Sequence, residues 1–124
     1  MVSYKKRSGT INASIARKGN SIIERTISPS GDYAVTHYKV IKEFDSYSVV
    51  QFVLETGRTH QIRVHSAYIG HPILGDTLYG SPSDLIARQA LHANQIEFIS
   101  PLTKKRVKYI APIPDDFKFI DNVK

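Results

Sequence analysis

The sequence predicts an α+β fold with a mostly antiparallel sheet, one buried central helix and short additional helices. Two observations support this class. Segments with the period-two alternation of strands lie before and after a single strongly helical segment, and no βαβ alternation appears. The length of 124 residues, 41% of them hydrophobic, allows one domain with a modest core. We therefore treat residues 1–124 as a single domain.

The first 32 residues are rich in Ser, Gly, Asn and Lys, which favours turns over regular elements. We predict that residues 1–32 are largely irregular, with one short strand from Ile11 to Arg17. The cluster Ser-Pro-Ser-Gly-Asp at residues 28–32 indicates a turn, in which Asp32 is interpreted as a structural residue.

Two further strands are predicted before the helix. Apolar and polar residues alternate at 38–40 and again along 50–54. An antiparallel pair joined around Asp45 and Ser46 accounts for both patterns.

A helix of about three turns is predicted next, because Thr56 and Thr59 are candidate N-caps and Gly70 is a typical C-terminal stop. His71-Pro72 breaks any continuation. Apolar residues flank the polar ones on the helical wheel, so the helix is expected to be buried on more than one face. These apolar residues are Ile62, Val64, Tyr68 and Ile69.

The last third of the chain is expected to return to strands. A loop holds Pro72 and Gly75, and a short helix is predicted after Ser81-Pro82, where Ser is a cap and Pro suits the first turn. Strands are then predicted at Leu91 to Ile99 and Arg106 to Ala111, with a turn at residues 100–105.

The charge balance favours a polyanionic partner. Lys and Arg number 17 against 11 Asp and Glu, which gives +6. One basic group falls in the first 26 residues, which hold a single acidic residue; a second, at 104–108, is interpreted as a solvated turn. Because the chain has no cysteine, no signal-peptide pattern and no long apolar run, we expect a cytoplasmic protein with no disulfide and no membrane span.

Arg63 stands out because a guanidinium in a buried helix needs a carboxylate, a phosphate or several carbonyls as partner. One interpretation is an ion pair within this chain, with Asp76 or Glu55. The other is a partner outside it. Asp76 itself has two interpretations, a catalytic carboxylate or a turn residue that accepts hydrogen bonds from nearby amides, and the second is favoured.

A metal site is not predicted. Of the four histidines near or beyond the helix, His60 and His65 are five residues apart, which is not the one-face spacing that helical ligands use. Arg58 is either a surface residue or a phosphate contact at the start of the helix, where free amides attract anions.

The motifs around the helix resemble those of RluA-type pseudouridine synthases, which modify uridines in ribosomal and transfer RNA. Residues 56–65 read Thr-Gly-Arg-Thr-His-Gln-Ile-Arg-Val-His, and residues 70–76 read Gly-His-Pro-Ile-Leu-Gly-Asp, followed by Leu-Tyr-Gly at 78–80. Leu91-His92-Ala93 is similar to the next block of the family. The resemblance extends from about Gly9 to Pro114.

The resemblance implies the C-terminal portion of a catalytic domain that needs no cofactor and no metal. In the family the nucleophile is an aspartate within an Arg-Leu-Asp motif, and no such tripeptide occurs in these 124 residues. Arg63 corresponds to the basic partner of that aspartate. We therefore expect the guanidinium of Arg63 to lie in a groove left open by the missing half, without an internal ion pair. The chain alone is expected to be inactive.

The expected partners are ribosomal or transfer RNA and the N-terminal half of the same enzyme. The predicted RNA contacts are Arg58, Thr59, His60, Lys5, Lys6, Arg7 and Arg17. Two alternatives belong to other classes. One is a non-catalytic RNA-binding module, whose binding would fall steeply with salt. The other is a half-domain that completes a sheet with a separate N-terminal fragment, for which an exposed apolar sheet edge would be the sign.

Overall fold

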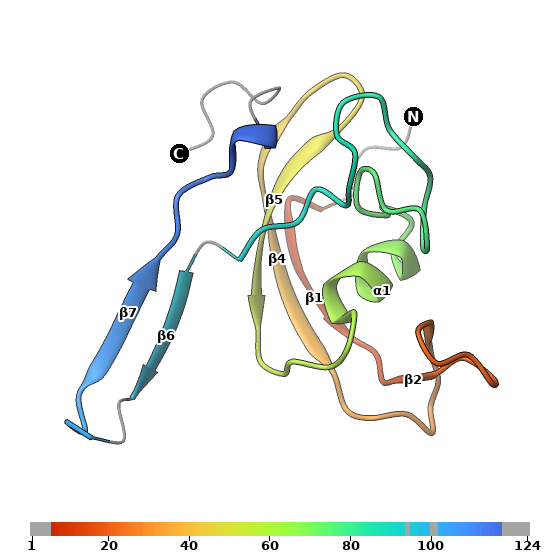
Figure 1. The fold of residues 1–124 in the computed structure, drawn as a ribbon. Helices are drawn as coiled ribbons and strands as arrows, with labels where there is room; N and C mark the ends of the chain where they lie inside the picture. The colour runs from red at the N-terminus through yellow and green to blue at the C-terminus, as the bar shows by residue number, and fades with distance from the viewer. Residues whose placement is uncertain (1–5, 94, 100–101, 118–124) are drawn as a thin grey trace.

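The computed structural model describes residues 6–93, 95–99 and 102–117. It is an α+β fold with one α-helix and antiparallel strands, as the sequence predicts (Figure 1). The strands form a three-stranded sheet in the order β1-β4-β5 and two hairpins, β2-β3 and β6-β7. The elements are β1 (Ser8–Asn12), β2 (Ile15–Arg17), β3 (Arg25–Ile27), β4 (Val35–Glu43), β5 (Ser48–Leu54), α1 (Gln61–Tyr68), β6 (Gln95–Ile99), β7 (Arg106–Ile110) and the 3-10 helix η1 (Asp115–Phe117).

The three-stranded sheet is built on β4, which pairs with β1 on one side and β5 on the other. The β4–β5 connection is tight, because the amide of Phe44 donates to the carbonyl of Tyr47 over 2.8 Å. This confirms the predicted hairpin around residues 45 and 46. The register shifts once between Val40 and Lys42, where the ladder is irregular.

The N-terminal segment is more regular than its composition predicts. The predicted strand at residues 11–17 is two strands, because the chain leaves β4 after Asn12 and re-pairs with β3 from Ile15 onward. A bridge closes the turn region: Ile15 and Asp32 exchange backbone hydrogen bonds of 2.9 and 2.8 Å. Pairing with β4 and β3 supplies the partners that local propensity alone does not indicate.

The helix α1 is shorter than predicted and begins differently. His60 is its N-cap, in the left-handed region with φ 56°, and neither Thr56 nor Thr59 caps it. The Thr56 hydroxyl instead accepts the amide hydrogen of Val35, which ties the loop to the sheet. The predicted stop is confirmed: Gly70 has φ +87° and its amide donates to Ala67.

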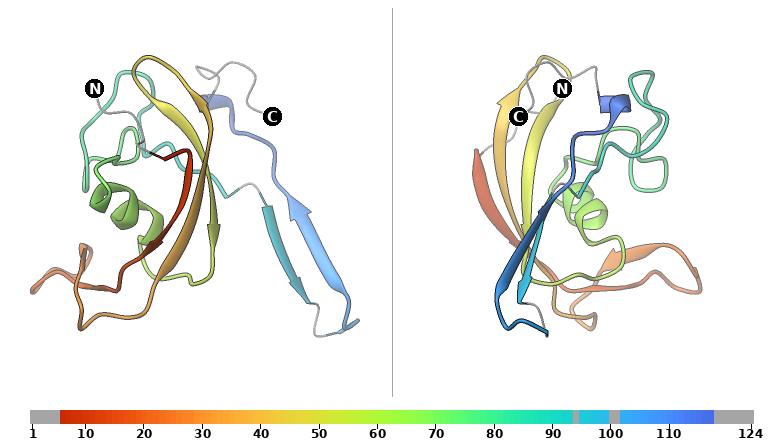
Figure 2. Two further views of the ribbon diagram at one scale, coloured as in Figure 1. Left: turned by 180° about the vertical axis from the view of Figure 1, so that it is seen from behind. Right: turned by 60° about the vertical axis from the view of Figure 1, so that its left-hand side comes forward.

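The core lies where α1 meets the β2–β3 hairpin and the start of β4. Ile15, Ala34 and Val64 form its buried cluster, and Ile27 and Tyr79 pack against it. Figures 1 and 2 show α1 on one face of the three-stranded sheet. The buried-helix prediction holds for this inner face, whereas Tyr68 is 60% exposed.

No helix forms after Ser81-Pro82; residues 81–90 are bends and irregular backbone. This segment is held instead by long-range contacts, such as the hydrogen bond of 2.8 Å from the Ala90 amide to Leu74. Beyond it the β6–β7 hairpin projects from the body (Figures 1 and 2). Its first strand begins at Gln95, later than predicted, and the turn is described only at residues 102–105. No helix of the described chain is long and apolar enough to cross a membrane.

Candidate functional site

The guanidinium of Arg63 is paired within the chain, contrary to the expected open groove. Its Nε and Nη2 atoms each donate to the Asp76 carboxylate over 2.8 Å, which is the two-pronged geometry of strong arginine–carboxylate pairs. The Arg63 side chain is 15% exposed and that of Asp76 is 0% exposed. Of the two interpretations left open by the sequence, the ion pair with Asp76 is therefore present.

The loop around Gly75 positions Asp76 for this pair. Gly75 has φ +77°, and an added Cβ would lie 2.3 Å from the Arg88 carbonyl oxygen, so only glycine fits this backbone. Asp76 Oδ1 also accepts the amides of Leu78 and Tyr79, over 3.1 and 3.2 Å. The prediction that Asp76 is a turn residue is thus confirmed, and the same carboxylate holds Arg63.

The electrostatics of Asp76 follow from these contacts. Burial raises the pKa of its carboxyl, but the hydrogen bonds from Arg63, Tyr79 and Leu78 and the charge of Arg63 outweigh burial and leave the pKa below its ordinary value. The hydrogen bond to Asp76 also raises the pKa of Arg63. Both partners are consequently charged at neutral pH.

Tyr79 connects the ion pair to the start of the helix. Its ring lies 5.2 Å from Cζ of Arg63, within cation–π range. Its hydroxyl oxygen accepts the Arg25 amide over 2.9 Å and lies 2.9 Å from Nδ1 of His60. Burial, then the charges of Arg63 and Arg25, lower the pKa of His60. Neutral His60 can therefore accept the Tyr79 hydroxyl hydrogen on Nδ1 and carry its own proton on Nε2.

A buried polar chain fixes the helix against the sheet. Gln61 Nε2 donates to the Thr36 hydroxyl over 2.9 Å, and that hydroxyl lies 2.8 Å from Nδ1 of His65. On its other side, Nε2 of His65 lies 2.8 Å from the Ala13 carbonyl, which can only accept. His65 is thus held neutral with its proton on Nε2, and burial lowers its pKa.

Because His65 is held neutral, we expect the protein to lose stability below neutral pH. The pKa of a buried His65 lies below the ordinary value of 6.5, so in this range the unfolded chain binds more protons than the folded one. The free energy of unfolding is then complete above pH 6.5 and falls as the pH drops toward the folded-state pKa. Burial lowers the pKa of His71 as well, which adds in the same direction. Urea unfolding at pH 7.5 and 5.5, with an NMR titration of the His65 ring, checks this; a ring that titrates at or above 6.5 would contradict it.

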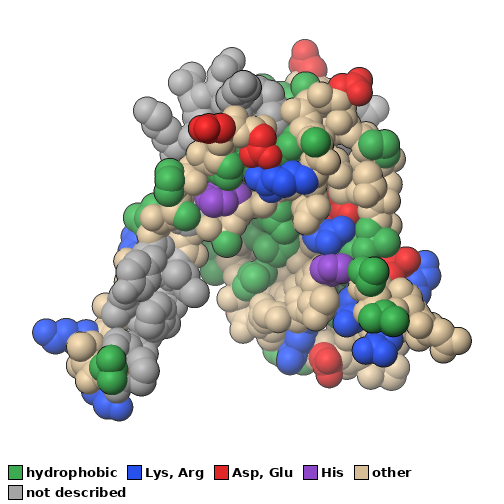
Figure 3. All heavy atoms as spheres, in the orientation of Figure 1, with side chains coloured by type: hydrophobic (Ala, Val, Ile, Leu, Met, Phe, Trp, Pro, Cys, Tyr) green, Lys and Arg blue, Asp and Glu red, His purple; other side chains and the backbone are tan. Residues whose placement is uncertain are grey.

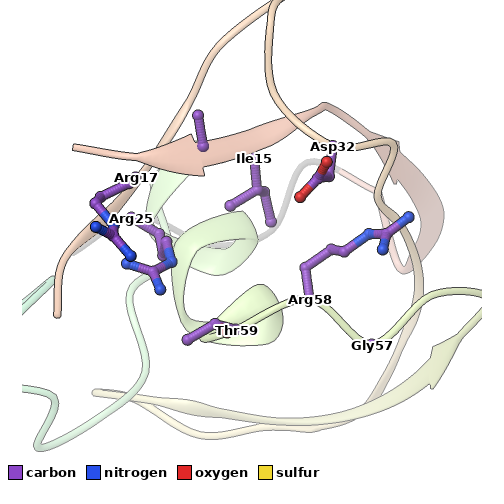
Figure 4. A pocket seen from close by; sticks show the side chains of 8 residues that line it. Ile15, Arg17, Arg25, Asp32, Gly57, Arg58 and Thr59 are labelled. Carbon is purple, nitrogen blue, oxygen red and sulfur yellow. The ribbon is translucent and has the colours of Figure 1, made fainter. Parts of the chain in front are cut away.

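A basic hollow of about 310 Å³ lies beside the N-terminus of α1. Figure 4 shows Arg17 and Arg25 close together on one side and Arg58 on the other, with Thr59 between them. Asp32 also lines the hollow. Figure 3 shows blue side chains gathered over this end of the molecule and at the tip of the β6–β7 hairpin.

The structure brings together only part of the predicted RNA-contacting set. Arg17, Arg58 and Thr59 line the hollow, and His60 follows directly after Thr59. Arg7 lies at the opposite end of β4, where it pairs with Glu43 at 3.4 Å. Lys6 is exposed near Arg7, and Lys5 lies outside the described residues.

Arg25 is the residue that sequence reasoning left out of the site. It lies opposite Arg17 in the β2–β3 ladder. The sequence predicts no strand at residues 25–27, so it gives no indication that the two arginines lie side by side.

No three His, Cys, Asp or Glu side chains of the described residues come together as a metal-binding group. Among these residues, the candidate chemistry rests on the Arg63–Asp76 pair, the Tyr79–His60 contact and the arginines of the hollow.

Comparison with known families decides the assignment. The model of the RNA pseudouridylate synthase family matches residues 2–68, which is more than half of the chain. The chain belongs to this family. The resemblance to RluA-type synthases in the sequence motifs is thereby confirmed.

Curated relatives cover the same region. The chain is 53% identical over 108 residues to the uncharacterized RNA pseudouridine synthase YjbO of Bacillus subtilis, covering 87% of this chain and 38% of that protein. It is 41% identical over 122 residues to ribosomal large subunit pseudouridine synthase D of Vibrio cholerae, covering 87% and 38% respectively. The chain thus spans about 38% of the length of these relatives.

A solved structure supports the fold. Human RNA pseudouridylate synthase domain containing 4 matches with a TM-score of 0.63 over 90% of this chain and 54% of that one. At 22% identity, this likeness shows that the present chain shares the fold of the human protein, and no more than the fold.

Proposed function

We propose that this chain supplies the C-terminal part of the active site of an RNA pseudouridine synthase that converts uridine to pseudouridine in ribosomal or transfer RNA. The family match over residues 2–68, which ends on the helix that carries Arg63, is the observation on which the proposal rests. The named relatives, whose own descriptions concern RNA and the ribosomal large subunit, support it.

Arg63 is the proposed partner of the nucleophilic aspartate of the complete enzyme. Asp76 occupies Nε and Nη2 of the guanidinium, and Nη1 has no hydrogen bond to any described residue. An arginine has five N–H donors, so a second carboxylate can bind at Nη1 while Asp76 fixes the orientation. The internal ion pair is therefore compatible with the catalytic role and gives Asp76 a positioning role.

Conversion of uridine to pseudouridine has two requirements that residues of this chain can meet. A target uridine inside a stacked helix cannot be reached, so it is flipped into a pocket while the RNA backbone is held by basic side chains. The nucleophilic aspartate must be ionised when the uracil detaches from its sugar and rejoins through carbon. An adjacent guanidinium favours the charged carboxylate, and this is what Arg63 contributes.

The Arg-Leu-Asp motif of the nucleophile is proposed to come from a segment outside these 124 residues, because the chain covers only 38% of its relatives and contains no such tripeptide. The edge of the sheet supports this part of the proposal. Among the described strands β5 pairs only with β4, and its Val53 is 58% exposed. An edge strand with exposed apolar side chains can pair with another strand along its free edge. The relatives named above come from bacteria, in which ribosomal RNA is made in the cytoplasm. We therefore propose a cytoplasmic location for this chain.

The first test is an activity assay. We expect the purified chain alone to produce no pseudouridine in ribosomal or transfer RNA, because the nucleophile is proposed to come from a segment outside these 124 residues. Co-expression with the preceding part of the Bacillus subtilis relative, which is 53% identical over the shared region, is expected to restore turnover. Mass-spectrometric detection of pseudouridine in the RNA measures this. Clear turnover by the 124 residues alone would show that the nucleophile lies within them and that the proposed division is wrong.

A further inference from the structure

Two arginines face each other in the β2–β3 hairpin. Arg17 and Arg25 are direct partners in the antiparallel register. Like charges at directly opposed positions destabilise a sheet, so this arrangement carries a folding cost unless an anion lies between them. Figure 4 shows both side chains on the same side of the hollow.

The arginines of the hollow differ from others in the chain in lacking a carboxylate partner among the described residues. Arg7, Arg63 and Arg88 each form an ion pair, with Glu43, Asp76 and Asp116. Within the described part of the chain, the guanidinium of Arg25 makes only long hydrogen bonds, of 3.3 and 3.5 Å, to the carbonyls of Ile22 and Ile23. Arg58 donates through Nε to the Tyr33 carbonyl over 2.8 Å, which fixes its stem and leaves both terminal nitrogens unused by the described residues.

The hollow is also connected to Arg63. The amide of Arg25 donates to the hydroxyl of Tyr79, whose ring lies against the Arg63 guanidinium. A group bound between Arg17 and Arg25 would therefore lie next to the nucleotide that reaches Arg63. The volume of about 310 Å³ is at the lower end of ligand-sized pockets and exceeds what one water or ion needs.

We propose that this hollow binds a backbone phosphate of the RNA that flanks the target nucleotide, with Arg17 and Arg25 as its main donors, Arg58 on the opposite side and Thr59 between them. The inference rests on the proposed function. A phosphodiester carries the single negative charge and the acceptor oxygens that a pair of guanidinium forks fits, and it relieves the repulsion between the two arginines. Because it contacts the backbone, the site positions RNA without reading its sequence.

The test compares two doubly neutralised variants with the same loss of charge. Arg17→Gln/Arg25→Gln removes the proposed donors; Lys104→Gln/Lys105→Gln removes two exposed charges at the turn of the β6–β7 hairpin. Fluorescence anisotropy with a labelled single-stranded RNA is measured over a range of salt concentrations. We expect the first variant to bind about tenfold or more weakly at low salt and its log–log salt slope to fall by about one, with little change in the second.

Folding provides an independent measurement. A structural role for the two arginines predicts that Arg17→Gln/Arg25→Gln unfolds at lower urea concentration, whereas a phosphate site predicts a midpoint that is unchanged or higher, because the repulsion is removed. Weakened RNA binding together with an undiminished midpoint supports the site.

A second arm separates failure of the site from failure of the proposed function. Inorganic pyrophosphate is titrated into the wild-type chain, with the amide NMR signals of Arg25, Arg58 and Thr59 followed. If pyrophosphate shifts these signals but the chain binds no RNA, the hollow is an anion site whose ligand is not RNA. Equal RNA affinity and salt slope in both variants, or no response to either ligand, would overturn the site even if the complete enzyme makes pseudouridine.

Discussion

Arg63→Met is expected to lower the free energy of unfolding of this chain by about 3 kcal/mol or more, because it leaves the buried carboxylate of Asp76 without its partner. Methionine keeps a long apolar stem, so the loss reports mainly on the charge pair rather than on packing. Equilibrium urea unfolding of the wild type and the variant at pH 7 measures the difference. A loss below about 1 kcal/mol would mean that the pair behaves as a solvent-exposed one.

A double-mutant cycle with Asp76→Asn isolates the interaction. Asparagine keeps an oxygen that can accept the amides of Leu78 and Tyr79, while it removes the charge. We expect the double variant to lose less free energy of unfolding than the two single variants lose in sum. Each single variant leaves one charge of the pair without its partner, whereas the double variant has removed both charges.

The pH dependence of Arg63→Met has a definite sign. In the wild type the pKa of Asp76 is below its ordinary value of 3.8, so the pair contributes stability above that pH and loses it as the pH falls through the folded-state pKa. Without Arg63, the hydrogen bond and the charge through which it lowers the pKa of Asp76 are lost, so this pKa rises from its wild-type position. The variant should therefore recover part of its deficit relative to the wild type in acid.

Local sequence signals predicted the parts of the fold that depend on local chemistry. The alternation at residues 38–40 and 50–54 indicated the β4–β5 hairpin, and Gly70 marked the end of α1 because only glycine readily adopts its positive φ. The role of Asp76 in the turn is also predictable from local chemistry, because Asp side chains accept hydrogen bonds from amides two or three residues further along the chain.

The errors all arise where distant segments decide the outcome. At the start of α1, Thr56 and Gln61 bond to the sheet and no side chain caps the helix, and no local signal reveals that. The absent helix after residue 82 has the same cause, because long-range contacts hold its segment. The Arg63–Asp76 pair could be named as a candidate, but choosing it required the loop at Gly75 to be folded.

The predicted RNA-contacting set shows the same limit. Closeness in sequence groups Lys6 and Arg7 with Arg17. In the fold Arg7 lies at the far end of β4, while Arg25 joins Arg17 through strand pairing. Charge counts favour a class of partner, whereas strand register decides which charges lie together.

Arg63→Lys is expected to reduce turnover of the reconstituted enzyme by about 100-fold or more, as the loss of a preorganised charged donor at a reacting centre does. Lysine keeps the positive charge but has no planar fork, so it cannot hold Asp76 through two nitrogens and present a third to the nucleophile. Asp76→Asn is the matched control, because it breaks the same internal pair and leaves the guanidinium in place. Its turnover should fall by a much smaller factor.

The most direct measurement is therefore the rate of pseudouridine formation by the reconstituted wild type, Arg63→Lys and Asp76→Asn, with the unfolding midpoint of each recorded alongside. We predict comparable losses of stability in the two variants, with a collapse of turnover confined to Arg63→Lys. Equal turnover in the two variants, tracking only their stability, would mean that Arg63 acts solely as the structural partner of Asp76 and would contradict its place in the active site.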